Sequence, residues 1–209
     1  MNILAIGAHP DDIEFGCGGT LLKYARAGHD VNLLVLTSGG YGADPFVRIK
    51  EQEESVKFLG GKGLFWGGFK DTELVDNREL ILKIEEVVKK VEPQIVFLNY
   101  LDDIHQDHRA SAQAGVSATR YVKEVLFYEV PTTFNFEPDI FVDIKDVLED
   151  KLHLLKLHAS QIDKTRVEGL TILDSAISCA TFRGYQGRVK YAEGFKALRI
   201  LRDLKMEHF

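Results

Sequence analysis

The chain has 209 residues with a formal net charge of −6, and its 45% hydrophobic and 28% charged content is ordinary for a soluble globular protein. Acidic and basic residues are interleaved, which argues against a nucleic-acid partner, and two cysteines without CxxC spacing exclude a disulfide framework. No apolar run approaches membrane-spanning length and no cleavable signal precedes the first predicted strand, so we expect a cytoplasmic protein.

Apolar runs of strand length alternate with longer helical patterns along the chain. The predicted strands are 2–8, 31–37, 63–66, 94–100, 125–129 and 140–144, and the predicted helices are 19–27, 46–59, 77–91, 108–120 and 147–161. The alternation predicts an α/β fold, a doubly wound, mostly parallel, Rossmann-like sheet with helices on both faces.

The expected organisation is a single domain over residues 1–209. A Rossmann-like core covers about 1–165, and a less regular C-terminal extension over about 166–209 packs on it. Within this extension, the pattern over residues 192–205 predicts a further helix.

Polar clusters follow the first and fourth predicted strands. In the common strand order 3-2-1-4-5 these two strands are neighbours, and ligands bind in the crevice between their carboxyl ends. His9, Asp11 and Asp12 follow the first strand, and His105, Asp107 and His108 follow the fourth. We therefore expect both clusters to converge on one crevice.

The residue types of the first cluster suit a metal site with a spare base. A catalytic zinc takes three protein ligands, for which His and Asp are suitable, and leaves a position for water. Adjacent aspartates in an irregular loop point in different directions, so one of Asp11 and Asp12 can bind the metal while the other accepts a proton. The alternative is a simple turn in which an aspartate caps the next helix.

In the second cluster, His108 at the start of a helix can reach the metal, and His105 can stand nearby as a cation or proton donor. Asp107 is placed to hold an imidazole in one tautomer. The alternative interpretation of this second cluster is a solvated loop. The spacing of Gly16, Gly18 and Gly19 is not GxGxxG, so a phosphate-binding loop is the weaker interpretation. We expect these glycines to let the following helix start close to the loop that carries the first cluster.

Taken together, the two clusters resemble the PIG-L/LmbE-like family of metal-dependent N-deacetylases. The likeness rests on the stretch Ala8-His9-Pro10-Asp11-Asp12 and on His105-Gln106-Asp107-His108, and it extends over nearly the whole chain. The resemblance implies three zinc ligands, with Fe²⁺ or another divalent metal as alternatives. These ligands are His9, Asp12 and His108.

The resemblance also implies roles for residues around the metal. Asp11 would be the general base that activates water, and His105 would stabilise charge or protonate the leaving amine with the support of Asp107. Arg48 matches a family arginine near the substrate, and Tyr191 matches a tyrosine near the oxyanion.

The activity implied by the resemblance is hydrolysis of an N-acetylglucosamine conjugate, such as one with malate or inositol, to acetate and a free amine. Its partner is this N-acetylated amino-sugar substrate, and the protein is expected to be a homo-oligomer, a trimer or a hexamer. Two rival functions stay open: a two-histidine, one-carboxylate Fe(II) enzyme, and a sugar- or nucleotide-binding module without turnover. The substrate-contacting roles of residues 130–137 and of Arg183 are not assigned by the sequence.

Overall fold

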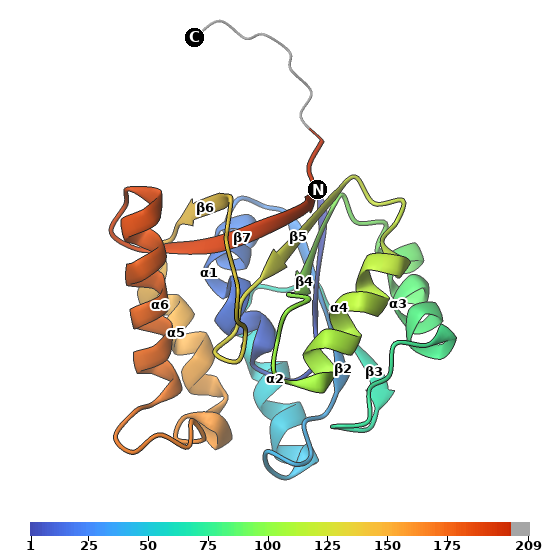
Figure 1. Ribbon diagram of the computed structural model, residues 1–209, viewed down its shortest axis with the longest axis horizontal. Helices are drawn as coiled ribbons and strands as arrows, with labels where there is room; N and C mark the ends of the chain where they lie inside the picture. The colour runs from blue at the N-terminus through green and yellow to red at the C-terminus, as the bar shows by residue number, and fades with distance from the viewer. Residues whose placement is uncertain (202–209) are drawn as a thin grey trace, which may run out of the picture.

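The computed structural model describes residues 1–201, which form a seven-stranded sheet between two layers of helices (Figure 1). The order β3-β2-β1-β4-β5-β7-β6 contains the predicted order 3-2-1-4-5, with parallel pairing from β3 to β5. β7 pairs antiparallel with β5 and with β6. The strands are β1 (Asn2–Gly7), β2 (Asp30–Thr37), β3 (Gly63–Phe69), β4 (Ile95–Asn99), β5 (Glu124–Tyr128), β6 (Ile140–Asp143) and β7 (Ala192–Arg199).

Helices cover both faces of the sheet, as predicted for a doubly wound fold. The helices are α1 (Asp12–Arg26), α2 (Pro45–Leu59), α3 (Arg78–Val91), α4 (Gln106–Ala118), α5 (Leu148–Leu157) and α6 (Ile172–Gly187), with a short 3-10 helix η1 (Ala159–Gln161). In β1, Ile3 and Ala5 join the apolar cluster under α1, α2, α5 and α6, whereas Leu4 and Ile6 join the cluster under α3 and α4. Burial on both faces explains why this strand is continuously apolar.

The C-terminal part of the chain differs from the prediction. Residues 192–199 form the strand β7 instead of the predicted helix, and residues 202–205 of that prediction lie outside the described residues. The first residues of β7 are buried between β5 and β6, and this sheet pairing outweighs the helical preference of the local sequence. The preceding segment, expected to be irregular, contains α6.

The first helix begins at Asp12, ahead of the predicted start at residue 19, so the glycines lie inside it. A Cβ atom on Gly16 would lie 2.0 Å from Cδ2 of Tyr128, which crosses the helix there. The N–H of Gly19 donates to the Glu193 carboxylate at 2.8 Å. The glycines therefore allow close packing, and this N–H is already engaged by a protein carboxylate.

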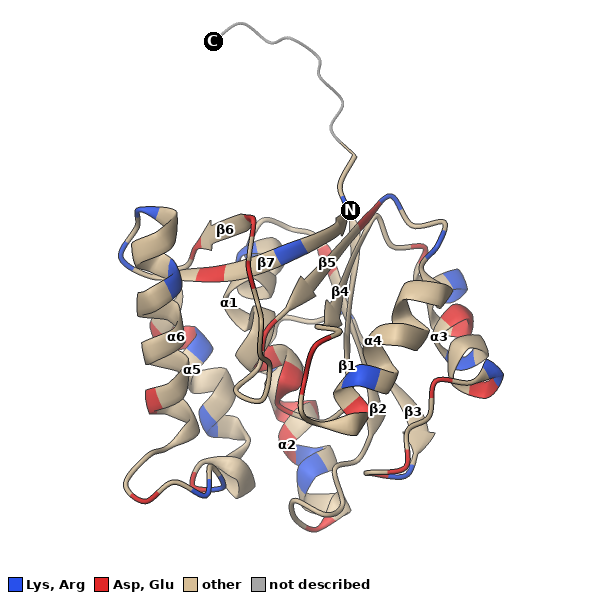
Figure 2. Ribbon diagram, viewed as in Figure 1, with Lys and Arg blue, Asp and Glu red and all other residues tan. Residues whose placement is uncertain are grey.

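Charges are mixed over the surface, as the composition suggested. Figure 2 shows basic and acidic positions together on α3, while the loop that follows β4 carries acidic residues. None of the described helices is long and apolar enough to cross a membrane.

Candidate metal centre

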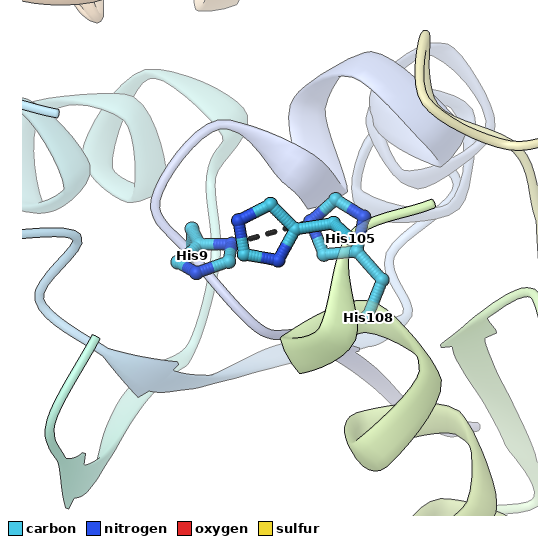
Figure 3. A group of neighbouring side chains, drawn as sticks. All are labelled: His9, His105 and His108. Carbon is cyan, nitrogen blue, oxygen red and sulfur yellow. Dashed lines mark hydrogen bonds between the residues drawn. The ribbon is translucent and has the colours of Figure 1, made fainter. Parts of the chain in front are cut away.

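The two polar clusters meet at the carboxyl ends of β1 and β4, which are paired in the sheet. Asn99, the last residue of β4, accepts a hydrogen bond from the Ala8 N–H at 3.2 Å, and its Nδ2 lies 3.4 Å from Oδ2 of Asp12. This side chain ties the turn after β1 to the neighbouring strand. Figure 3 shows the result, with His9 facing His105 and His108 from the start of α4.

Three donor atoms lie close together in this crevice. His9 Nδ1 and His108 Nε2 are 3.2 Å apart, and Asp12 places one carboxylate oxygen, Oδ1, 3.3 Å from His108 Nε2 and the other, Oδ2, 3.7 Å from His9 Nδ1. Ligands at the usual zinc distances in a tetrahedral arrangement are roughly 3.3–3.6 Å apart. The donor set therefore fits a divalent cation such as zinc.

The second ring nitrogen of His9 and that of His108 each contact a carboxylate oxygen. His9 Nε2 is 3.0 Å from Asp71 Oδ1 and 3.1 Å from Asp107 Oδ2, and His108 Nδ1 is 3.2 Å from Asp103 Oδ1. Such contacts fix the tautomer and ring orientation of metal-binding histidines. Asp107 thus holds His9, whereas the resemblance had implied that it supports His105.

The charges within this group reinforce one another. Burial opposes charge on all three side chains, but His108 and His9 hold the pKa of Asp12 well below its usual value. The same ion pairing raises the pKa of His108 to about 9, and hydrogen bonds to Asp107, Asp12 and Asp71 hold the pKa of His9 well above its usual value. At neutral pH, a cation entering this group must displace protons.

His105 is held differently from the other two histidines. It is the N-cap of α4, where its Nδ1 accepts the Asp107 backbone N–H at 3.2 Å, so Nε2 carries the proton in the neutral ring. Burial and the nearby His9 and His108 lower the pKa of His105. Of the two roles expected for His105, a cation or a proton donor, its surroundings favour the neutral donor.

Asp11 has a strained backbone and an accessible side chain. Its φ of 90° is unusual for a residue other than glycine, and its carboxylate forms no hydrogen bond that caps α1. The side chain is 23% exposed, against 8% for that of Asp12. Burial raises the pKa of Asp11, and the Arg48 guanidinium opposes this rise.

The buried Arg48 is bonded to the loops around the site. Nη2 lies 3.2 Å from Asp11 Oδ1 and donates to the Pro10 carbonyl, while Nη1 donates to the Gly39 carbonyl at 3.1 Å. Arg48 also lines the cavity. Tyr191, in contrast, is not among the described residues that line the cavity and packs against the apolar cluster under α1.

A cavity of about 990 Å³ opens above these residues. Beyond the two polar clusters, its wall consists of side chains from the segments that follow β2, β3 and β5 and from the stretch between residues 161 and 179. The wall residues of these last two segments are Glu129, Val130, Pro131, Thr132, Thr133, Gln161, Lys164, Thr165, Arg166, Val167, Leu170, Ile172, Ser175 and Cys179.

Part of the unassigned segment 130–137 supports the second cluster directly. The Thr132 hydroxyl lies 3.2 Å from His108 Nδ1, and the Thr133 hydroxyl donates to Asp103 at 2.8 Å. The unassigned Arg183 forms two hydrogen bonds, of 2.6 and 2.7 Å, with the carboxylate of Glu129 in the cavity wall.

Asp71 was not singled out from the sequence as a site residue, although its position after a strand was a usable signal. It comes directly after β3, at the sheet edge where polar residues after β1 and β4 had been singled out. Thr132 carries no comparable signal, because its contact with His108 depends on how the segment after β5 folds back.

Comparisons with known proteins show the family of the chain. Residues 4–119 match the family described as PIG-L: GlcNAc-PI de-N-acetylase. The chain is 37% identical over 167 residues to the uncharacterized deacetylase YaiS of Escherichia coli strain K12, covering 76% of this chain and 90% of that protein. It is 31% identical over 227 residues to the diacetylchitobiose deacetylase of Thermococcus kodakarensis, covering 93% and 82%. The solved structure of the conserved protein TT1542 from Thermus thermophilus has a TM-score of 0.88 at 26% identity, covering 100% of both chains.

Proposed function

Because the chain belongs to the PIG-L family, we propose that it is a zinc-dependent hydrolase that removes the acetyl group from an N-acetylglucosamine unit of a small conjugate. One observation carries this proposal. His9 Nδ1 and His108 Nε2 lie 3.2 Å apart, and the Asp12 carboxylate contacts both, through Oδ1 to His108 and Oδ2 to His9, beside a separate, partly exposed carboxylate on Asp11. This arrangement supplies both a cation site and a base.

In this proposal His9, Asp12 and His108 are the metal ligands, and Asp71, Asp107 and Asp103 orient the two imidazoles. A divalent cation there supplies a Lewis acid that polarises the amide carbonyl and lowers the pKa of water towards about 7. Iron or another divalent metal would satisfy the same donors.

Asp11 acts as the general base. Its carboxylate takes a proton from the attacking water as the oxygen bonds to the acetyl carbon, and its pKa, raised by burial, favours this transfer. Arg48, 3.2 Å away, keeps the carboxylate oriented. When the C–N bond breaks, the proton passes to the amine nitrogen and acetate is released.

His105 acts as the donor to the reacting amide. Its Nδ1 is occupied by the Asp107 N–H, so Nε2–H is available to the carbonyl oxygen as negative charge develops there. A neutral donor is sufficient for this role, and removal of such a group typically costs about 3 kcal/mol of transition-state stabilisation.

The substrate class follows from the relatives and from the cavity. One relative is named a diacetylchitobiose deacetylase and another a probable N-acetyl-alpha-D-glucosaminyl L-malate deacetylase 2. The cavity of about 990 Å³ is within the range that holds a whole small ligand, so it accommodates more than an acetyl group. We also propose a cytoplasmic protein and, from the family resemblance, a homo-oligomer, a trimer or a hexamer, whose mass light scattering would measure.

A panel assay tests the proposed function. The zinc-loaded protein is incubated with N-acetylglucosamine, N,N′-diacetylchitobiose and the malate and inositol conjugates of N-acetylglucosamine, and acetate and free amine are measured. Equimolar acetate and amine from at least one compound would support the proposal. Oxygen consumption with bound iron would favour the Fe(II) enzyme, and tight sugar binding without acetate release would favour the binding module.

A further inference from the structure

A second polar cluster lies behind the Asp11 turn, and of its members only Arg48 has a role in the proposed reaction. Glu14 of α1 is 1% exposed, and its Oε1 accepts hydrogen bonds of 2.6 Å from both Gln52 and Ser55 of α2. His158, which follows α5, is also 1% exposed, and its Nε2 lies 3.5 Å from Glu14 Oε1. Arg48 stands one helical turn before Gln52, on the same side of α2.

Within the described part of the chain, the buried side-chain atoms without a hydrogen-bond partner in the protein all belong to this cluster. They are Glu14 Oε2, Arg48 Nε, Gln52 Oε1 and both ring nitrogens of His158. An unpaired buried polar atom is costly, and native proteins normally satisfy such atoms with protein groups or ordered water. Gln52 and His158 both contact Glu14, so these unpaired atoms belong to neighbouring side chains.

The chemistry of these atoms suits a water molecule. Arg48 Nε–H and a protonated ring nitrogen of His158 are donors, while Glu14 Oε2 and Gln52 Oε1 are acceptors. Buried waters typically make about three such bonds, with two to four polar partners.

We propose that His158 is a positioning residue, which together with Glu14 and Gln52 binds an internal water that holds Arg48 Nε–H and so fixes the guanidinium against Asp11. The other guanidinium nitrogens already contact Pro10, Gly39 and Asp11, so a bond at Nε fixes the plane of the group. The predicted effect on catalysis rests on the proposed role of Asp11 as a base. The binding of the water does not depend on that role.

Matched variants separate positioning from a general effect on folding. His158→Leu removes both ring nitrogens at similar volume, and His158→Gln returns one donor and one acceptor. His153→Leu is the control, because His153 lies on the exposed side of α5. Near-UV circular dichroism and zinc content establish that each variant is folded and loaded.

Crystal structures give a readout that does not depend on activity. In the wild type we expect an ordered water within about 3.2 Å of a His158 ring nitrogen and of Glu14 Oε2 or Arg48 Nε. In His158→Leu this water is lost and the Arg48–Asp11 contact lengthens. A wild-type cluster without water, or an unchanged Arg48–Asp11 contact in the variant, would overturn the proposal. If His158→Leu does not fold, the wild-type and His158→Gln structures decide the question.

Kinetics with N,N′-diacetylchitobiose test the consequence. His158→Leu should lower kcat about tenfold, a change of about 1.4 kcal/mol in the barrier, with KM and zinc content unchanged. His158→Gln should recover most of kcat, and His153→Leu should match the wild type. A change in KM alone, or equal loss in His158→Leu and His153→Leu, would contradict positioning. If the wild type releases no acetate from any compound of the panel, the proposed function fails while the crystal structures still decide the water site.

Discussion

The two adjacent aspartates of the turn after β1 have different surroundings. Asp12 lies between two imidazoles, which hold its pKa well below the usual value, while Asp11 faces the cavity and Arg48 with a raised pKa. A carboxylate that stays ionised suits a metal ligand, and one with a raised pKa suits a base. The roles of the two residues can therefore be separated by mutation.

Asp11→Asn should retain zinc and lose turnover. The amide keeps the size of the side chain but accepts no proton, so we expect kcat to fall by about 10²–10⁴-fold. Zinc content by elemental analysis should stay at the wild-type value. Normal turnover in this variant would show that Asp11 is not the base.

His108→Ala should lose the metal, because it removes one of the three donors. Asp103→Asn keeps that donor but weakens the partner of its Nδ1, 3.2 Å away, so zinc affinity should fall by about 10–100-fold. Competition with a chromophoric chelator measures both effects. Wild-type affinity in both variants would place the metal elsewhere.

Zinc affinity should rise with pH between about 6 and 9. The surroundings of His108 raise its pKa to about 9, so below this value the ring is protonated and zinc must displace the proton. Displacement of the His108 proton makes the apparent affinity increase about tenfold per pH unit below pH about 9, and the raised pKa of His9 adds to this dependence. Chelator competition at a series of pH values checks this slope, and affinity independent of pH would contradict the assigned protonation.

Two glycines inside α1, Gly16 and Gly18, differ in how much space is available for a side chain. A Cβ on Gly16 would lie 2.0 Å from the Tyr128 ring, whereas a Cβ on Gly18 would meet Leu154 Cδ1 at 3.3 Å. Gly16→Ala should lower the free energy of unfolding by about 1–3 kcal/mol through overpacking. Gly18→Ala should cost less, because alanine favours the helix and the Leu154 side chain can shift. Urea denaturation compares the two, and equal effects would contradict this explanation.

Hydrophobic periodicity predicted the elements with strong local patterns. It failed where contacts with distant parts of the chain determine the secondary structure. The central residues of β1 and β4, 3–6 and 95–98, are all apolar because both faces are covered, and the adjacency of these strands brought His9 and His108 together as expected. β7 has the composition of a helix and becomes a strand because it completes the sheet beside β5 and β6. The start of α1 was missed because glycines normally interrupt a helical pattern, whereas here the side chains of Tyr128, Leu154 and Ile144 occupy the space beside Gly16, Gly18 and Gly19.

For the whole molecule, the chemistry of the site was easier to predict than its substrate. The polar residues near the donor atoms lie in short sequence motifs. The part of the cavity wall farther from these atoms is formed by residues from 130–133 and 161–179, which contain no comparable motif. Even close to the metal, Asp71 and Thr132 reach the histidines only through the path of the chain after β3 and β5. The side chains that a sugar conjugate contacts therefore depend on tertiary structure.

The most direct test of the account is acetate release as a function of bound zinc, measured for the wild type and Asp11→Asn with the most reactive conjugate of the panel. We predict that wild-type acetate release rises in proportion to bound zinc until one ion is bound per chain, because the proposed ligands His9, Asp12 and His108 form one site. Asp11→Asn at equal zinc content should release acetate about a hundredfold more slowly or less. Acetate release that is independent of zinc, or equal in the two proteins, would contradict a metal-dependent deacetylase with Asp11 as its base.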